Sequence, residues 1–474
     1  MTRQHLIDNV QRYFDEGRFA TDLRRRVAWR TESDTGKVPP ELRAYLTDEM
    51  VPWLTPLGFA CEVLDNPSPQ GGPFLVARRV EDPALPTVLT YGHGDVVNGQ
   101  DTQWREGLSP WELTIEGERW YGRGTADNKG QHTVSLAALA HTIEARGGRL
   151  DYNVTLLMEM GEEAGSPGLG AFCEQHRDAL TADLFVASDG PRVNAGHPTL
   201  FLGSRGAINF SLAVRSRDKA YHSGNWGGVL ANPATVLTHA LATLVDAKGR
   251  ILVKGLLPPA VPDKLRTALQ DVVIGADANA PALTPGWGEP GLTPAEQLVG
   301  WNTLEVLALG AGNAQRPINA IPAQAVAHCQ LRFVVGTDWQ NVQATLRKHL
   351  DAHGFSQVEI TMGMHCGATR LDLHNPWVDW TMASLQASAG QPATLLPNLA
   401  GSLPNDIFAD QLGLPTLWVP HSYPACSQHA PNEHLLAPVA REGLAVMAGL
   451  FWDLGEPQGT PWTEGRTARH EATA

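Results

Sequence analysis

The sequence is short of cysteine, of long apolar runs and of positive charge. Its five cysteines are dispersed, with no pair at CxxC spacing, which excludes a thiolate zinc knuckle and is typical of buried thiols in a reducing compartment. No apolar run approaches the roughly 20 residues that span a bilayer. The first 20 residues are charged and amphipathic, without the apolar core of an export signal. We therefore expect a cytoplasmic protein that is not embedded in a membrane.

Acidic residues outnumber basic ones by 50 to 36, which gives a formal net charge of -14. This balance argues against nucleic acid and anionic membranes as partners. The GxSxG sequence of a serine-hydrolase elbow is also absent, and no cysteine has a strand-end context. A serine or cysteine hydrolase is therefore disfavoured.

Hydrophobic periodicity predicts an α/β fold with a mostly parallel sheet and helices on both of its faces. Strands are expected at 74–77, 86–91, 153–158, 182–188 and 415–419, and helices at 40–57, 134–143, 169–176, 377–387 and 435–452. Between these two groups lies an α+β pattern, with strands at 207–214, 251–253, 304–309, 325–335 and 358–362 and helices at 233–245, 262–273 and 338–350. The second pattern is interpreted as a domain inserted into the first.

The domain boundaries follow from these patterns. The α/β domain is predicted at 1–204 and 367–455, the inserted domain at 205–366, and a polar, disordered tail at 456–474.

Histidine and acidic residues follow the predicted strands of the α/β domain. His93 ends one strand, Glu162 and Glu163 follow the next, Asp189 follows a third, and Asp127 lies in a glycine-rich loop before a helix. Because sites in such sheets lie at the carboxyl ends of the strands, these side chains are expected to converge. Nitrogen and oxygen donors without thiolates suit a divalent first-row metal such as zinc. One Asp can bridge two such ions about 3.5–4 Å apart.

Four motifs carry a resemblance to a known family. They are HGD at 93–95, GTADNKG at 124–130, MGEEAGS at 160–166 and ASD at 187–189. Together they resemble the di-zinc metallopeptidase family of carnosinases, aminoacylases, acetylornithine deacetylase and succinyl-diaminopimelate desuccinylase. The resemblance runs from about residue 89 to residue 433. Asp189, where many relatives carry Glu, is similar to the carnosinase-like branch.

The resemblance implies two Zn²⁺ per chain, with Mn²⁺ or Co²⁺ as substitutes. It implies that His93 and Asp189 hold one ion, that Glu163 and His429 hold the other, and that Asp127 bridges them.

The second ion leaves a choice among late histidines. His429 leads a His-x-x-Asn-Glu pattern at 429–433 that is similar to the family's. His434, expected at the start of the following helix, is the runner-up, and His421 is interpreted as a loop residue. Glu433 is a candidate acceptor to orient the imidazole of His429.

Two further roles follow from the resemblance. Glu162 would act as the general base on a water activated by the two zinc ions. Asp95 would accept a hydrogen bond from the imidazole of His93 and fix its tautomer.

The inserted domain resembles the family's lid and dimerisation domain. His222, within YHSGNWGG at 221–228, would reach into the partner subunit's active site and stabilise the oxyanion, which implies a homodimer through this domain. Asn319 lies in an NAIP sequence that is similar to the family's. Arg332 would bind the substrate carboxylate, and Ser402, in the GSLP loop at 401–404, would meet the same group.

The sequence therefore predicts a metal-dependent hydrolase of an amide bond in a small substrate with a free carboxylate. A dipeptide is the favoured substrate, and deacylation of an N-acyl amino acid by the same mechanism is the alternative. A non-catalytic binding protein of this fold is disfavoured, because Glu162 and the complete set of ligands are present.

Overall fold

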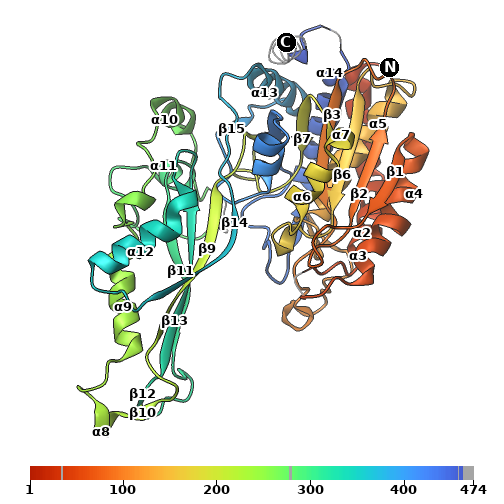
Figure 1. The fold of residues 1–474 in the computed structure, drawn as a ribbon. Helices are drawn as coiled ribbons and strands as arrows, with labels where there is room; N and C mark the ends of the chain where they lie inside the picture. Colours follow the sequence, from red (N-terminus) through yellow and green to blue (C-terminus); the bar gives the residue numbers. More distant parts are fainter. Residues whose placement is uncertain (34–35, 277–279, 457, 463–474) are drawn as a thin grey trace.

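The computed structural model describes residues 1–33, 36–276, 280–456 and 458–462. In this part of the chain, two units lie side by side (Figure 1). The larger unit is built on an eight-stranded sheet and the smaller on a four-stranded sheet.

The large sheet has the strand order β1-β2-β6-β3-β7-β16-β8-β15. In chain order the strands are β1 (Ala60–Leu64), β2 (Phe74–Arg79), β3 (Thr87–His93), β6 (Asn153–Glu159), β7 (Leu184–Ala187), β8 (Thr199–Phe201), β15 (Thr394–Leu396) and β16 (Thr416–Trp418). The pairs β6–β3, β3–β7, β7–β16 and β8–β15 are parallel, whereas β1–β2, β2–β6 and β16–β8 are antiparallel. Parallel pairs predominate, as predicted, and β6, β3, β7 and β16 present their carboxyl ends at one edge.

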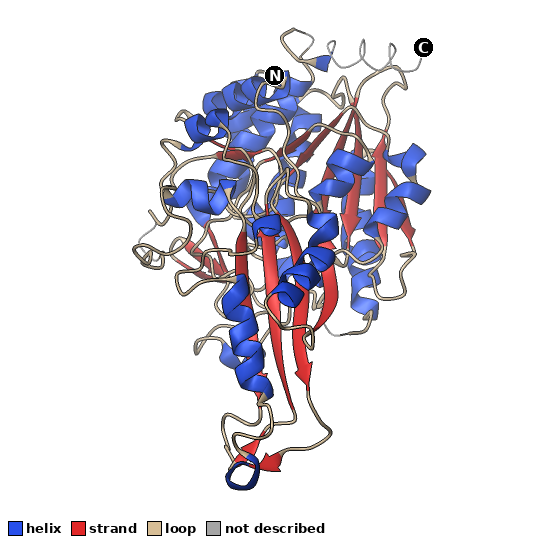
Figure 2. Cartoon of the chain, turned by 60° about the vertical axis from the view of Figure 1, so that its left-hand side comes forward, coloured by secondary structure: helices blue, strands red, loops and turns tan. Residues whose placement is uncertain are grey.

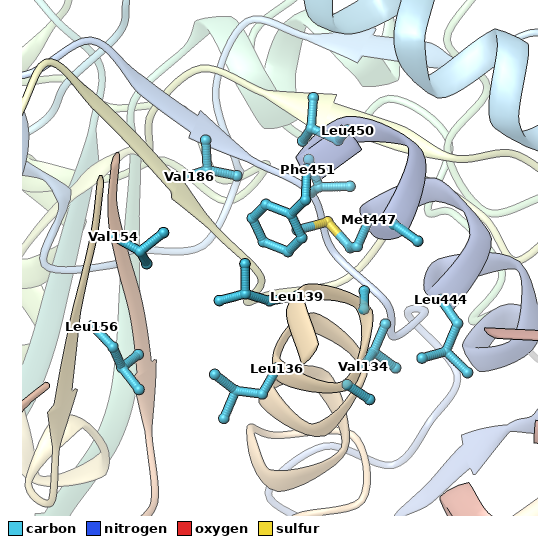
Figure 3. Close-up of a cluster of buried hydrophobic side chains, with 14 of the residues drawn as sticks. Val134, Leu136, Leu139, Val154, Leu156, Val186, Leu444, Met447, Leu450 and Phe451 are labelled. Carbon is cyan, nitrogen blue, oxygen red and sulfur yellow. The ribbon is translucent and has the colours of Figure 1, made fainter. Parts of the chain in front are cut away.

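A buried helix, α5 (Lys129–Ala145), organises the core on one face of the large sheet. It is buried around its circumference, as expected of a helix that is covered on all sides. It contacts α14 (Ala437–Leu454), which in turn packs against α1 (Arg3–Asp15) and α13 (Pro376–Ala389). Figure 3 shows Val134, Leu136 and Leu139 of α5 between strand residues such as Val154 and Leu156 and the α14 residues Leu444, Met447, Leu450 and Phe451.

The other face of the sheet is covered partly by the inserted unit. There α6 (Leu169–Gln175) packs in one apolar cluster with α10 (Asp263–Leu269) and α11 (Pro294–Gly300), which belong to the inserted segment. Leu265 and Val299 from these two helices share that cluster with Phe185 and Trp418 of the large sheet. The two units are therefore joined by packing as well as by the chain.

The inserted unit contains an antiparallel sheet in the order β11-β13-β9-β14. These strands are β9 (Gly206–Arg215), β11 (Thr303–Ala311), β13 (Gln324–Phe333) and β14 (Glu359–Cys366). Helices α9 (Pro233–Leu244) and α12 (Val342–Ala352) pack on it. Figure 2 shows the long strands extending to a tip, where β10 (Tyr221–His222) pairs with β12 (Ala320–Ile321). Because all four long strands fall within 206–366, we propose the boundaries of the inserted domain at 205 and 366.

The remaining elements are short. They are α2 (Arg18–Val27), α3 (Pro40–Ala44), α4 (Val51–Leu54), α7 (Arg177–Leu180), α8 (Ser223–Trp226), β4 (Thr114–Glu116), β5 (Arg119–Tyr121) and β17 (His434–Leu436). The helix predicted at 40–57 is observed as α3 and α4 with a π-helical turn (Tyr45–Met50) between them and a 3-10 turn (Thr55–Leu57) after them. No helix of the described residues is long and apolar enough to cross a bilayer.

Three sequence expectations differ from the structure. The predicted strand at 251–253 is reduced to one bridge between Ile251 and Val245. The predicted helix at 435–452 begins only at Ala437, because residues 434–436 form β17 and pair with β5. In the predicted tail, the indole of Trp462 packs against Trp377 and donates a hydrogen bond to the Leu454 carbonyl at 3.0 Å. Residues 457 and 463–474 of that tail lie outside the described residues.

The core around α5 makes a stability prediction. Leu139 is only 1% exposed, so Leu139→Ala removes buried methyl groups and leaves a cavity, which typically costs about 2–5 kcal/mol. We expect urea-induced unfolding to show this loss in the free energy of unfolding. Ile115→Ala, at a position that is 44% exposed in the same unit, is the control and should change it by less than about 1 kcal/mol. Equal losses in the two variants would contradict the packing described for α5.

Candidate metal centre and active site

The predicted ligands converge at one edge of the large sheet. β3, which ends at His93, lies between β6, which leads to the turn with Glu162 and Glu163, and β7, which leads to Asp189. His93 Nε2 lies 3.6 Å from Asp189 Oδ2 and 3.9 Å from Glu162 Oε2. The same nitrogen lies 3.0 Å from Asp127 Oδ1, which reaches the cluster from the loop before α5. The strand order explains this meeting, because neighbouring parallel strands end at one edge.

Two groups of donor atoms share one carboxylate. The ligand atoms of His93, Asp127 and Asp189 lie within 4.8 Å of one another, and so do those of Asp127, Glu163 and His429. Asp127 Oδ2 is 3.1 Å from His429 Nε2, and that nitrogen is 2.9 Å from Glu163 Oε2. Asp127 thus turns one oxygen to each group, which is the geometry expected of a carboxylate between two metal ions.

The loop that carries Asp127 is held by a carboxylate from the far end of the chain. Glu433 Oε1 accepts hydrogen bonds from the backbone N–H groups of Ala126 at 2.9 Å and Asp127 at 3.1 Å. Arg123 donates to Glu433 Oε2 at 2.7 Å, and both side chains are buried. The recorded partners of the Glu433 carboxylate are thus the Asp127 loop and Arg123, and its orientation of His429 stays a prediction.

Glycine is required where this loop closes on the start of α5. Gly124 has a φ of 85°, in the left-handed region that a side chain disfavours. A Cβ at Gly130 would lie 1.9 Å from the Thr125 carbonyl oxygen. The two outer glycines of the GTADNKG motif are thus explained by the tight turn that presents Asp127.

Asp95 positions the turn that carries the two glutamates. Its carboxylate accepts hydrogen bonds from the backbone N–H groups of Glu162 at 3.2 Å and Glu163 at 3.1 Å, and from the hydroxyl of Ser33 at 2.6 Å. His93 Nδ1 lies 3.1 Å from the carbonyl oxygen of Asp95 and 3.4 Å from its Oδ1. The imidazole of His93 is thus closer to the backbone carbonyl of Asp95 than to the carboxylate that was predicted to accept its hydrogen bond. Ser33 lies outside every motif, so sequence reasoning missed it.

The two other late histidines are engaged away from the ligand groups. His434 Nε2 lies 2.6 Å from the hydroxyl of Tyr423, and its Nδ1 lies 3.0 Å from the carbonyl of Asn432. It lies in a strand, not at the helix start that was expected. His421 is fully buried beside the hydroxyl of Ser188 at 3.2 Å. His429 instead has a φ of 60°, a strained backbone of the kind that clusters at functional sites.

The predicted substrate residues fall in two places. Arg332 donates a hydrogen bond to the Ser402 hydroxyl at 2.8 Å, so these two residues meet across the junction of the units. Asn319 lies instead beside His222, because its carbonyl accepts from the N–H of Ser223 at 2.9 Å and β10 pairs with β12. Figure 1 shows this pair of strands at the end of the inserted unit that is remote from the large sheet. The structure thus does not place His222 and Asn319 with the Arg332–Ser402 pair of the same chain.

The donor set fits divalent cations. Asp189 Oδ2 is buried and makes no hydrogen bond within the described part of the chain. Burial and the nearby charge of Asp127 raise the pKa of Glu163 to about 7 and the pKa of Asp189 to about 6. A cation stabilises the ionised form of such carboxylates. Imidazole nitrogens with carboxylate oxygens suit Zn²⁺, and carboxylates also accept Mn²⁺.

Comparison with known proteins identifies the family. The model of peptidase family M20/M25/M40 matches residues 89–453, which is most of the chain. This chain belongs to that family. The membership confirms the resemblance found in the sequence motifs.

The relatives of this M20 chain include named dipeptidases. It is 34% identical over 273 residues to Beta-Ala-His dipeptidase of Mus musculus, with 54% of each chain covered. It is 36% identical over 173 residues to Cysteinylglycine-S-conjugate dipeptidase of Corynebacterium striatum, with 36% of this chain and 37% of that protein covered. The chain spans about half the length of the mammalian relatives it matches.

Solved structures share the fold. The M20 family metallo-carboxypeptidase Sso-CP2 from Sulfolobus solfataricus aligns with a TM-score of 0.79 at 24% identity, covering 92% of this chain and 99% of that one. Human carnosine dipeptidase 1 aligns with a TM-score of 0.77 at 22% identity, covering 95% and 99%. These likenesses confirm the predicted fold class.

The geometry supports His429 over His434 as the histidine that completes the second donor group. We predict that His429→Ala lowers the bound metal towards one ion per chain and abolishes activity, because Asp127 and Glu163 then lack their nitrogen partner. His434→Ala, the matched control, should keep two ions. Metal analysis by mass spectrometry measures both. Two ions retained in His429→Ala with one in His434→Ala would reverse the assignment.

Proposed function

We propose that this chain is a two-metal dipeptidase that hydrolyses the amide bond of a small substrate with a free carboxylate. The observation that carries the proposal is the sharing of Asp127 between two groups of metal-binding side chains. The dipeptidase names of the relatives support a dipeptide over an N-acyl amino acid as the substrate. We place the enzyme in the cytoplasm, in keeping with five cysteines that are all free.

In this proposal His93 and Asp189 would hold one ion, Glu163 and His429 would hold the other, and Asp127 would contribute to both sites. Zinc suits these donors, and Mn²⁺ or Co²⁺ would fit the same set. When bound, the two ions would lower the pKa of a water molecule and polarise the scissile carbonyl.

Glu162 is proposed as the general base. Its side chain is 17% exposed and lies 3.9 Å from His93, so it borders the donor groups and remains accessible. It takes a proton from the attacking water as the new C–O bond forms, and it delivers that proton to the amine nitrogen as the C–N bond breaks. Burial raises the pKa of Glu162 well above that of an ordinary glutamate, which favours holding the proton between the two transfers. Asp95 contributes by fixing the backbone of the turn.

Substrate recognition is proposed at the Arg332–Ser402 pair, where the guanidinium and the hydroxyl would hold the free carboxylate. His222 and Asn319 are proposed to act in the partner's site within a homodimer that forms through the inserted unit. In support, β11 lies at an edge of its sheet, and its residues Val306, Leu307 and Leu309 are 39%, 59% and 55% exposed. Exposed apolar side chains on an open sheet edge favour association.

Glu162→Gln tests the mechanism. The amide keeps the shape of the side chain but cannot accept a proton, so kcat should fall by about 10²–10⁴-fold. Metal content should stay at the level of the parent protein, and both quantities are measured on one preparation. Glu144→Gln, at a carboxylate that is 81% exposed, is the matched control and should leave kcat unchanged. Normal turnover of Glu162→Gln with full metal would remove Glu162 from the mechanism.

Mixing two inactive variants tests the role of His222 across subunits. His222→Ala and Glu162→Gln homodimers should each be inactive. After subunit exchange, one of the two sites in a mixed dimer regains both residues, so part of the activity should return. Size-exclusion chromatography and a tag on one variant verify the exchange. Verified mixed dimers without activity would mean that His222 acts within its own chain or has no catalytic role.

A further inference from the structure

A buried arginine that belongs to none of the motifs joins the two units. Arg205 is 4% exposed and lies one residue ahead of β9. Its Nε donates to the Ala400 carbonyl at 2.7 Å, and its Nη1 donates to the Trp301 carbonyl at 3.3 Å. Its backbone N–H donates to the Leu399 carbonyl at 3.0 Å. Trp301 follows α11 of the inserted segment, whereas Leu399 and Ala400 begin the loop that carries Ser402. Arg205 therefore ties that loop to the inserted unit.

Arg205 lies beside Arg332. In the pairing of β9 with β13, Arg332 is opposite Ala207, and Arg205 is two residues before Ala207. The two guanidinium groups are close enough for the charge of Arg332 to act on Arg205. Burial and the charge of Arg332 lower the pKa of Arg205 to about 9. A guanidinium is not deprotonated in proteins, so both side chains are cationic at neutral pH.

Arg205 differs from Arg123 and Arg192, which are also buried. Arg123 is paired with Glu433 at 2.7 Å, and Arg192 is paired with Glu442 at 2.5 Å. Within the described residues, neither Arg205 nor Arg332 has a carboxylate within 4.0 Å. The buried Arg205 charge is held by carbonyl oxygens, with no carboxylate of the described residues in contact, and the charge of Glu305 also acts on it. Two such cations side by side favour the entry of an anion.

We propose that Arg205 is a positioning residue for recognition of the substrate carboxylate. Arg205 holds the loop in the position where the Ser402 hydroxyl contacts Arg332. It also adds a second positive charge near the place where the substrate carboxylate would bind. This inference rests on the proposed function and names the part of the substrate, its free carboxylate, on which Arg205 acts.

The test compares a dipeptide acid with the corresponding dipeptide amide, β-alanyl-L-histidine and its C-terminal amide. Calorimetry on metal-loaded Glu162→Gln protein measures binding without turnover. Adding Arg205→Gln should weaken binding of the acid at least tenfold, a loss of about 1.4 kcal/mol. Binding of the amide should stay within about threefold, or 0.7 kcal/mol. Arg205→Lys keeps the charge but cannot donate to both carbonyls in the same way. Its affinity for the acid should therefore lie between those of the parent and the Gln variant. It serves as the test if the Gln variant does not fold.

Arg217→Gln is the matched control. Arg217 also donates to two backbone carbonyls, those of Pro322 at 3.2 Å and Ala231 at 2.6 Å, but it lies within the inserted unit. Unlike Arg205, whose partner Ala400 lies in the large unit, Arg217 has both acceptors in the inserted unit, so Arg217→Gln should leave the preference for acid over amide unchanged. In protein with Glu162 intact, Arg205→Gln should raise KM for the acid while kcat changes little.

The outcomes separate this inference from the proposed function. If Arg205→Gln weakens binding of the acid and of the amide equally, or weakens neither, the proposed role of Arg205 would be overturned. An Arg205-dependent preference for the acid in a protein that hydrolyses neither compound would support the inference and overturn the proposed function. A parent protein that binds neither compound would overturn both.

Discussion

The hydrogen bonds between Glu433 and the loop at Asp127 support the rest of the centre. Two backbone N–H groups and the guanidinium of Arg123 converge on this one carboxylate. Because the Arg123–Glu433 pair is buried, removing either side chain would leave a charge without its partner, which typically costs about 3–5 kcal/mol. The loop is therefore held stiffly, and Asp127 can turn its two oxygens to two separate donor groups.

The sheet and most ligands could be predicted because they depend on local pattern. Apolar runs end at His93, before Glu162 and before Asp189, and the rule for parallel strands then brings these residues to one edge. Ser33 and Glu433 could not be assigned in this way, because their roles arise from contacts with residues 62 and more than 300 positions away. The strand at 434–436 was missed for a similar reason. Its apolar residues fit a helix equally well, and only pairing with β5 favours the strand.

The junction between the units explains how recognition could depend on both of them. Arg332 comes from the inserted sheet and Ser402 from the large unit, so the proposed carboxylate site would be complete only when the units meet. Packing of α10 and α11 against the core of the large unit favours that arrangement. β10, which contains His222, lies at the far end of the same inserted unit (Figure 1). The inserted sheet thus connects Arg332 at the junction to the strands at the tip, which in the proposed homodimer would serve a second molecule.

The position of Glu433 and His429 near the end of the chain has a consequence for biosynthesis. On the proposed assignment, every ligand of the first ion has been translated by residue 189. The second ion cannot bind fully until His429 has been made, and the Asp127 loop cannot form its hydrogen bonds with Glu433 until residue 433 has been made. β16, which lies between β7 and β8, is also made only after residue 415. A nascent chain therefore cannot assemble the paired centre while it is still being elongated through the inserted unit. Hydrolytic capacity would arise only after residue 433 has been made, when the surrounding fold can form.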